Sequence, residues 1–314
     1  MTFQTKPLNT EMMSGRRHSP ATITGGAPLP LAHVHQEIDE ASASFWSFFR
    51  AETGLCFSSA MLRDLTAMQM TLPSIQAARV AAGKNPLRYY VTGSHLPGVF
   101  NLGGDLALFM RAIRAGDRDG LRAYGQLCIE AVYNVYVAAR LPLTTIMLVQ
   151  GEALGGGFEA ALSADIIVAE RRARFGLPEI LFNLFPGMGA MSFLSRRLDA
   201  TRAEKIILSG KVYTAEEMHA MGIVDILAED GFGEEAVRDY IAGEARRYNA
   251  HYAIRQAKKR ANPVTFEELS DIVELWVDSA LRLEESDLRR MARLVAAQEK
   301  RQGKSAHPMH VAAE

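Results

Sequence analysis

The chain has 314 residues, and its 35 Lys and Arg side chains against 36 Asp and Glu side chains leave a net charge of −1. This balance argues against a nucleic acid or an anionic membrane as the main partner, because both attract proteins through a basic field. No run of about 18 apolar residues is present, so we predict no membrane-spanning segment. The two cysteines, Cys56 and Cys128, fit no zinc or redox spacing, which is typical of a cytoplasmic protein.

The two ends of the chain lack the apolar periodicity of a helix or a strand. Residues 1–40 are rich in Thr, Ser, Pro and Gly, and we predict a mostly disordered arm there, with a second disordered segment at residues 303–314. His33 and His35 stand close together in the arm. We assign no metal to them, because no third ligand stands near them in the sequence.

Between these ends, strand and helix patterns alternate. In chain order, the patterns predict a strand at 43–49, a strand at 55–57, a helix at 59–72, a strand at 87–93, helices at 105–115 and 117–139, a strand at 144–150, a helix at 157–164, a strand at 166–169, and helices at 189–198, 203–208, 215–221, 234–247 and 266–299. This alternation indicates βαβ units, so we predict an α/β fold with a largely parallel sheet. The last helices have no strands to cover, and we expect them to pack on another subunit or over the active site.

Two glycine-rich loops stand out, because glycines at the start of a helix are costly in chain entropy. The first loop contains Gly103 and Gly104, and the second contains Gly155, Gly156 and Gly157. No G-x-G-x-x-G or Walker sequence is present, which argues against a nucleotide-phosphate site. The backbone N–H groups of two such loops can instead converge on a carbonyl oxygen that gains negative charge, so we predict an oxyanion site.

Three acidic residues stand near these loops. Asp105 follows the first loop directly, and we interpret it as the N-cap of the next helix. Glu159 stands in the first turn of an apolar helix, as either an exposed acid favoured by the helix dipole or a functional acid. Glu179 stands 20 residues later in an apolar run, where an unpaired carboxylate is unfavourable. Two carboxylates that face one site repel, so one tends to hold a proton, and the pair supplies a general base and a general acid.

Several spaced motifs together resemble the crotonase (enoyl-CoA hydratase/isomerase) superfamily. They stand in the family's order over roughly residues 42–302, at 154–159 (LGGGFE), 176–180 (GLPEI), 186–189 (PGMG) and 215–225 (AEEMHAMGIVD). The resemblance implies a crotonase-like ββα spiral core at residues 41–232 and a C-terminal helical region at residues 233–302, used for trimerisation and covering the active site. It also implies a homotrimer or hexamer, acyl-thioester binding, and no cofactor or metal.

By motif position, the resemblance assigns roles to individual residues. It places the oxyanion N–H groups on Gly104 and Gly156 and the catalytic acids on Glu159 and Glu179, and it leaves open which acid is the base. The substrate-binding residues that it implies are Leu154, Gly155, Met188, Trp276 and Leu294. The last three match positions of an acyl tunnel, with ordinary helix core as the alternative. Three further polar residues are kept out of catalysis: His219 and Asp225 match framework positions, and Glu152 is predicted to lie on the surface.

Two departures narrow the resemblance to one branch. Residues 189–193 read GAMSF where common hydratases read G-G-T-Q-R, and the terminal K-R-x-P-x-F signature is reduced to residues 300–301. With 100–105 (FNLGGD), 181–186 (LFNLFP) and 274–278 (ELWVD), these features resemble the bacterial diffusible-signal-factor synthases. In that branch a 3-hydroxyacyl chain on acyl carrier protein is dehydrated and then cleaved from its thioester, which gives a cis-2-unsaturated fatty acid for quorum sensing.

The family analogy also implies a sensor-kinase regulator. An ordinary enoyl-CoA hydratase or isomerase that acts on CoA thioesters is the alternative function. A catalytically silent crotonase-fold scaffold or RNA-binding subunit is the second alternative, disfavoured because both glutamates are present and no basic patch is visible.

Overall fold

The computed structural model describes residues 29–305, so the predicted tail at 306–314 and the first 28 residues of the predicted arm lie outside the described residues. Within the described part, the larger sheet has the strand order β1-β2-β3-β5-β7-β10. Its strands are β1 (Val34–Asp39), β2 (Ser44–Phe49), β3 (Tyr89–Ser94), β5 (Thr144–Val149), β7 (Ile166–Glu170) and β10 (Ile226–Ala228). Every neighbouring pair is parallel except β1 with β2. The fold is therefore α/β, as predicted.

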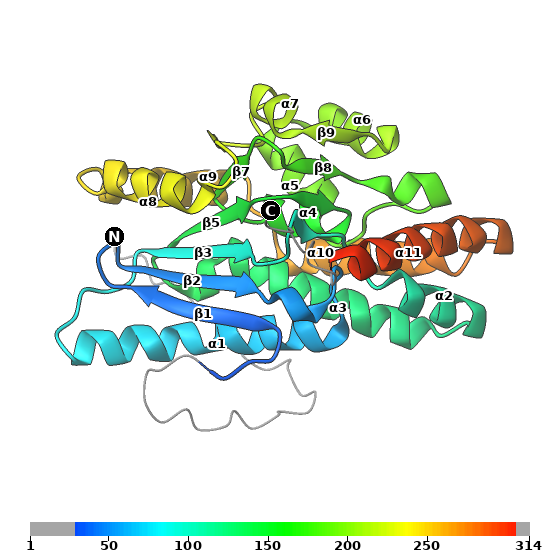
Figure 1. Cartoon of the computed structure of the whole chain (residues 1–314), viewed down its shortest axis with the longest axis horizontal. Coiled ribbons are helices and arrows are strands. Elements are labelled where there is room, and N and C mark those ends of the chain that lie inside the picture. Colours follow the sequence, from blue (N-terminus) through cyan, green and yellow to red (C-terminus); the bar gives the residue numbers. More distant parts are fainter. Residues whose placement is uncertain (1–28, 306–314) are drawn as a thin grey trace, which may run out of the picture.

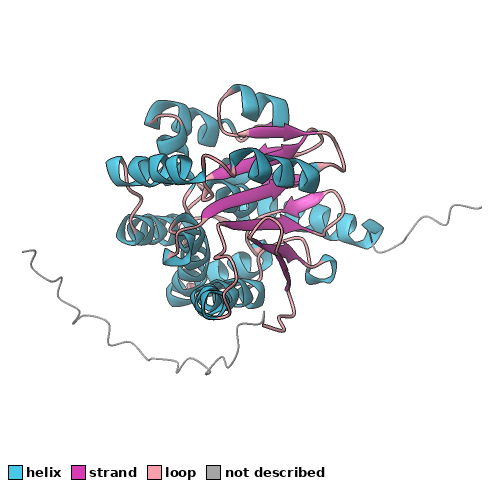
Figure 2. Ribbon diagram, turned by 90° about the vertical axis from the view of Figure 1, so that its left-hand side faces the viewer, coloured by secondary structure: helices cyan, strands magenta, loops and turns pink. Residues whose placement is uncertain are grey.

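A smaller sheet stands beside the larger one, with the strand order β4-β6-β8-β9. Its strands are β4 (Val99–Asn101), β6 (Glu152–Leu154), β8 (Arg174–Gly176) and β9 (Val212–Thr214), and only β9 runs antiparallel to its neighbour. The chain passes from the larger to the smaller sheet three times in succession, at β3–β4, β5–β6 and β7–β8. These repeated passages build the spiral core, whose strands stand together in Figure 2 with most of the helices on one side.

Helices cover the sheets and form most of the described chain after β10. In chain order they are η1 (Ala51–Thr53), α1 (Ser59–Ala81), α2 (Leu106–Ala115), α3 (Arg118–Tyr136), η2 (Ala138–Arg140), α4 (Gly156–Leu162), η3 (Pro178–Phe182), α5 (Ala190–Arg197), α6 (Ala200–Ser209), α7 (Ala215–Ala220), α8 (Gly233–Glu244), α9 (Tyr248–Ala261), α10 (Phe266–Ala280) and α11 (Glu285–Ser305). Figure 1 shows α10 and α11 beside α2 and α3, so the C-terminal helices pack on the core of their own chain.

The two faces of the larger sheet contact different helices. Because side chains alternate along a strand, Tyr90 of β3 packs in the main core with α1 and α3, whereas Tyr89 packs in a second cluster. That second cluster contains Val237 and Ile241 of α8. The face that carries Tyr90 therefore looks toward the helices that surround the site described below.

Short polar residues set where the helices of this region begin. Asp105 caps α2, because its Oδ1 accepts a hydrogen bond of 2.8 Å from the N–H of Leu108. Gly116 ends α2 with a φ of 64°, and Asp117 then caps α3 through the N–H of Gly120 at 2.9 Å. The predicted N-cap role of Asp105 is confirmed.

Four predictions about elements are wrong. Residues 34–39, assigned to the disordered arm, form β1, because pairing with β2 satisfies their backbone and buries Val34 to 1% exposure. Residues 55–57 do not form a strand; only Phe57 bridges, to Gly104. The helix at 59–72 continues to Ala81 through Pro73. The predicted helix at 266–299 is two helices, α10 and α11, separated by residues 281–284. Helix α9 was not predicted, and none of its residues is fully buried.

Candidate functional site

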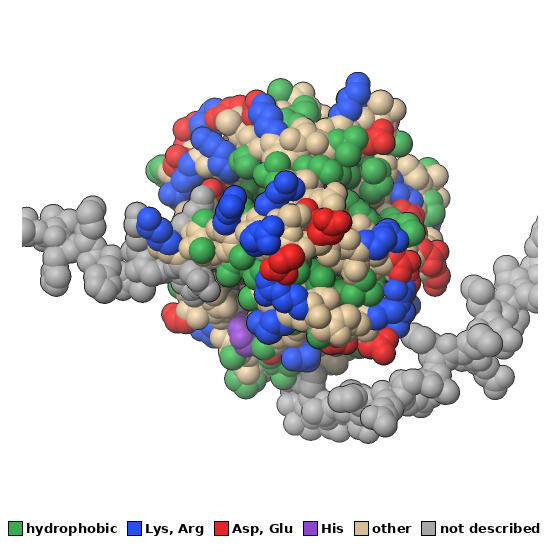
Figure 3. Space-filling view, turned by 90° about the vertical axis from the view of Figure 1, so that its right-hand side faces the viewer, with side chains coloured by type: hydrophobic (Ala, Val, Ile, Leu, Met, Phe, Trp, Pro, Cys, Tyr) green, Lys and Arg blue, Asp and Glu red, His purple; other side chains and the backbone are tan. Residues whose placement is uncertain are grey.

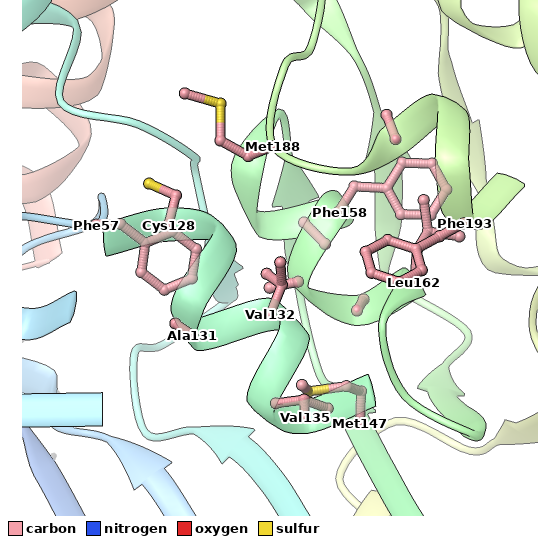
Figure 4. Packing of buried hydrophobic residues seen from close by; sticks show 14 of the residues in the cluster. Phe57, Cys128, Ala131, Val132, Val135, Met147, Phe158, Leu162, Met188 and Phe193 are labelled. Atoms are coloured by element: carbon pink, nitrogen blue, oxygen red, sulfur yellow. The ribbon is translucent and has the colours of Figure 1, made fainter. Parts of the chain in front are cut away.

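A cavity of about 280 Å³ lies between the small sheet, α3 and the C-terminal helices. All nine residues that the sequence marked as catalytic, oxyanion or substrate-binding line this one cavity: Gly104, Leu154, Gly155, Gly156, Glu159, Glu179, Met188, Trp276 and Leu294. Trp276 comes from α10 and Leu294 from α11, so the C-terminal region covers the cavity of its own chain. Figure 4 shows part of its apolar wall, with Met188 above Cys128 and with Val132 and Val135 farther along α3.

The two glycine loops touch one another. Gly103 has a φ of 97°, and a Cβ atom at this position would lie 2.9 Å from the carbonyl oxygen of Leu154 and 3.0 Å from the nitrogen of Gly156. Only glycine allows both this conformation and this approach. The loops are therefore in backbone contact at the edge of the cavity.

Hydrogen bonds hold the first loop on both sides of Gly104. The carbonyl of Gly103 accepts a bond of 2.8 Å from the N–H of Phe57, and the N–H of Asp105 donates to the hydroxyl of Tyr124 at 3.1 Å. Gly156 starts α4, so its N–H belongs to the first turn, where an N–H has no acceptor within the helix. Both glycines line the cavity, and their N–H groups suit the binding of one oxygen atom.

Glu159 is a buried acid, with only 2% of the residue exposed. Its Oε1 accepts two backbone hydrogen bonds, from Met188 at 2.8 Å and from Ala190 at 3.0 Å. Burial raises the pKa of Glu159 to about 7, and the two N–H donors keep it from rising further. Its position in the first turn of α4 is therefore not that of an exposed acid beside a helix dipole.

Glu179 has a different environment on η3. The residue is partly exposed, but its Oε2 is enclosed and has no hydrogen-bond partner among the described residues. Burial is the largest cause that raises the pKa of Glu179, and the charge of Glu159 raises it further. Because two N–H groups stabilise the charge of Glu159 and that charge in turn raises the pKa of Glu179, Glu159 should lose its proton before Glu179 as pH rises.

The other polar residues singled out in the sequence lie outside this cavity. His219 contacts the carbonyl of Val224 through Nδ1 at 2.9 Å, and Asp225 accepts from the N–H of Ile167 at 2.7 Å, so both tie neighbouring segments together. Glu152 is partly exposed on β6. His33 contacts Asp64 at 2.7 Å.

Sequence reasoning missed several polar residues that line the cavity. Tyr124 anchors the first loop, and Gln69, Tyr90 and Thr92 line the cavity from α1 and β3. In the sequence these residues belong to ordinary apolar helix and strand patterns. Only the burial of their polar atoms distinguishes them, and that signal is absent from the sequence.

The profile of the enoyl-CoA hydratase/isomerase family matches residues 75–302. The chain belongs to this family. A probable enoyl-CoA hydratase from Mycobacterium leprae is 35% identical over 177 residues, which cover 55% of this chain and 62% of that protein. A peroxisomal fatty acid β-oxidation multifunctional protein from Arabidopsis thaliana is 34% identical over 134 residues, or 43% of this chain and 18% of that protein. The chain thus spans less than two thirds of either relative.

Solved structures support the same fold. A crystal structure of human mitochondrial Δ3-Δ2-enoyl-CoA isomerase has a TM-score of 0.69 at 17% identity, and the match covers 86% of this chain and 99% of that chain. A structure of DspI from Pseudomonas aeruginosa has a TM-score of 0.61 at 24% identity, with 78% and 95% covered. At these identities the likeness concerns the fold.

The surface and the helices add two observations. On the face in Figure 3, Lys and Arg side chains are interspersed with Asp and Glu side chains and with apolar side chains. Among the helices of residues 29–305, none is both long enough and apolar enough to cross a membrane.

Proposed function

We propose that this protein dehydrates a 3-hydroxyacyl thioester carried by acyl carrier protein to the cis-2-enoyl thioester and then hydrolyses the thioester, which releases a diffusible fatty-acid signal. One observation carries the proposal. Two interacting carboxyls, both with a raised pKa but with different hydrogen-bond partners, line a largely apolar cavity together with two glycines that start or flank helices. This set of groups suits proton removal next to a thioester carbonyl, and the apolar wall suits an acyl chain.

The dehydration step assigns a separate role to each glutamate. The N–H groups of Gly104 and Gly156 hold the carbonyl oxygen while ionised Glu159 takes the proton from C2. The electron pair of that C–H bond forms the C2=C3 double bond through an enolate, and the C3–O bond breaks. Protonated Glu179 gives its proton to the departing hydroxyl, which leaves as water. Proton exchange with solvent then restores both carboxyls.

The hydrolysis step uses the same oxyanion groups. Ionised Glu159 takes a proton from a water molecule as the water oxygen bonds to the thioester carbon. The resulting oxyanion is held by Gly104 and Gly156, and the C–S bond then breaks. The carrier thiolate takes up a proton, so the products are a free 2-enoic acid and the carrier thiol.

An ordinary enoyl-CoA hydratase or isomerase is the second candidate function. Relatives named as hydratases, such as the probable enoyl-CoA hydratase of Mycobacterium leprae, favour it. The two candidates share the glutamates and differ in the carrier and in the second step. A cytoplasmic location, assembly as a trimer or hexamer and regulation by a sensor kinase accompany the first candidate as further proposals.

The deciding experiment offers one acyl group on two carriers. Purified protein is incubated with 3-hydroxydecanoyl thioesters of acyl carrier protein and of CoA, and mass spectrometry follows water loss and free-acid release. We expect free cis-2-decenoic acid, formed faster from the carrier protein, and no product with a Glu159→Gln, Glu179→Gln double variant. Reversible hydration of CoA thioesters without free acid would support the ordinary hydratase instead. No turnover of either carrier would favour a silent scaffold.

A further inference from the structure

The Glu179 carboxyl depends on the backbone of η3 for its position. The other acid, Glu159, accepts hydrogen bonds from Met188 at 2.8 Å and from Ala190 at 3.0 Å, in a different segment of the chain. In Glu179, by contrast, Oε2 has no hydrogen-bond partner among the described residues, and the donor that lowers the pKa of this carboxyl is its own backbone N–H. Where the carboxyl lies in the cavity is therefore set by the η3 backbone and by packing.

Asn183 ends η3 and turns the chain back onto Glu179. Its φ of 61° and ψ of 31° lie in the left-handed region, which asparagine adopts more readily than most residues. In this turn the N–H of Leu184 donates a hydrogen bond of 3.1 Å to the carbonyl of Glu179, and the N–H of Asn183 donates one of 3.1 Å to the carbonyl of Ile180. The conformation of Asn183 thus helps to hold the backbone of Glu179.

The side chain of Asn183 bonds a different element, α11. Its Nδ2 donates a hydrogen bond of 3.3 Å to the Oδ2 of Asp287, which is only 5% exposed. The same Oδ2 accepts from the N–H of Glu284 at 3.1 Å, and Arg290 lies 3.6 Å from Oδ1. A buried carboxylate needs such partners. Among the described residues, Asn183 is the one partner of this carboxylate that lies outside residues 284–290.

Helix α11 also forms part of the cavity wall. Leu294 and Ala297 line the same cavity as Glu179. Leu294 follows Asp287 by seven residues, which is about two helical turns or about 10 Å. The helix packs against η3 and α2, with Met291 fully buried. One helix therefore connects the cover of the cavity to the segment that carries Glu179.

We propose that Asn183 and Asp287 are positioning residues, whose hydrogen bond fixes η3 against α11 and so places the Glu179 carboxyl beside the substrate. This role rests on the proposed use of Glu179 as the proton donor. A misplacement of about 1 Å at a reacting group can cost about 100-fold in rate, so a bond that touches no substrate atom can still control kcat. The competing explanation is that the bond only stabilises α11, in which case Glu179 keeps its place without it.

Asn183→Gly is the decisive variant, because glycine keeps the left-handed turn and removes only the amide. We expect kcat for water loss to fall about 10-fold or more, with KM little changed. Asp287→Ala should lose as much. Asp287→Asn should keep near-normal kcat, because a single oxygen atom of Asp287 accepts both bonds and asparagine retains one such oxygen. The double variant Asn183→Gly, Asp287→Ala should be no slower than the slower single variant.

Arg114→Gln is the matched control. The pair of Arg114 with Glu285, at 2.7 Å, also ties α11 to the core, but it reaches α2 and not η3. This variant should leave kcat unchanged while thermal unfolding reports any loss of stability. Normal kcat in Asn183→Gly, or an equal loss of kcat in Arg114→Gln, overturns the proposal.

A measurement without turnover separates this inference from the proposed reaction. NMR of the glutamate carboxyl carbons, assigned by comparison with Glu179→Gln, follows the titration of Glu179 in each variant. Its pKa of about 8 should fall toward 4.5 in Asn183→Gly, because a carboxyl that leaves its place regains water, and it should stay raised in Arg114→Gln. This result supports the positioning role even if no thioester reacts. An unchanged pKa in Asn183→Gly overturns the role, whatever reaction the protein catalyses.

Discussion

Gly155 lies against Glu179, and a Cβ atom at Gly155 would be 2.6 Å from the Oε1 of that glutamate. Gly155 also has a φ of 51°, in the left-handed region. Gly155, which precedes α4, therefore packs directly against the carboxyl group of Glu179. This contact joins the LGGGFE and GLPEI segments, which are separate motifs in the sequence.

Gly155→Ala should lower kcat at least about 10-fold, because the added methyl group displaces the Glu179 carboxyl from its place beside the substrate. Gly83→Ala is the matched control. Gly83 also has a positive φ, of 69°, but a Cβ there meets nothing within 4 Å. Both variants carry a backbone strain of about 1–2 kcal/mol, so their melting temperatures should fall, and only Gly155→Ala should lose turnover. Equal activity in the two variants would remove Gly155 from the positioning of Glu179.

Glu159→Gln and Glu179→Gln should each fold and lose at least about 100-fold in dehydration, the usual contribution of a positioned acid or base. Glu130→Gln serves as the control, because Glu130 is an exposed glutamate on α3, the same helix that lines the cavity. Initial rates of water loss from a 3-hydroxyacyl thioester provide the measurement. Near-normal turnover in either active-site variant would rule out the two-carboxyl mechanism.

The stability of the protein should depend on pH through Glu179. Its pKa is raised from 4.5 to about 8, mainly by burial. Below pH 4.5 the carboxyl is protonated in the folded and the unfolded states alike. Between pH 4.5 and about 8 the unfolded state releases its proton first, so the free energy of unfolding falls as pH rises, and the fall is complete above about pH 8.

Glu179→Gln removes this dependence and should therefore raise stability relative to wild type by about 1–3 kcal/mol at pH 9 and by little at pH 4. Thermal unfolding of both proteins across this range measures the difference. Glu285→Gln is the control with the opposite sign, because Arg114 lowers the pKa of Glu285. A Glu179→Gln variant that is no more stable than wild type at pH 9 would contradict the raised pKa.

Met188→Trp should move the chain-length optimum to shorter substrates. Met188 is buried in the cavity wall, and each CH₂ of an acyl chain that enters such a wall contributes about 0.8 kcal/mol. The flexible methionine side chain can change rotamer to make room for an acyl chain, whereas a tryptophan ring would occupy that part of the cavity. Wild-type kcat/KM should rise steeply from four to about twelve carbons, and the variant should lose the longer chains first.

Met191→Trp is the matched control for this substitution, because Met191 is 37% exposed on α5 and does not line the cavity. Its chain-length profile should match that of wild type. A wild-type preference for four carbons would favour a short-chain hydratase. An unchanged profile in Met188→Trp would place the acyl chain elsewhere.

Local chemistry let the sequence predict which glycines and glutamates lie together at the cavity. Glycine at Gly103 and Gly155 is required by positive φ values and close backbone contacts, and such requirements leave visible glycine runs. A glutamate in an apolar segment can also be recognised in the sequence, because burying its charge with that segment is unfavourable. The alternating strand and helix patterns predicted the α/β class for the same reason: burial on one face imposes a period on the sequence.

Only the tertiary structure decided the remaining features. Residues 34–39 become a strand because β2 offers them an unpaired edge, and nothing in their own pattern requires it. The different environments of Glu159 and Glu179 come from the N–H groups of Met188 and Ala190, which are brought to α4 by the chain that follows it. These contacts join segments far apart in the sequence, and their effect on a pKa or a strand exists only after folding.

The lining of the cavity shows most clearly which features the sequence predicts and which depend on the fold. The sequence by itself predicted that two glycine loops, two acids and apolar residues would form one site, and these residues do line one cavity. Gln69 and Tyr90 sit in ordinary helix and strand patterns, and only packing shows that both residues line the cavity. Whether a buried hydroxyl has a partner depends on distances to residues on other elements, and those distances are a property of the fold.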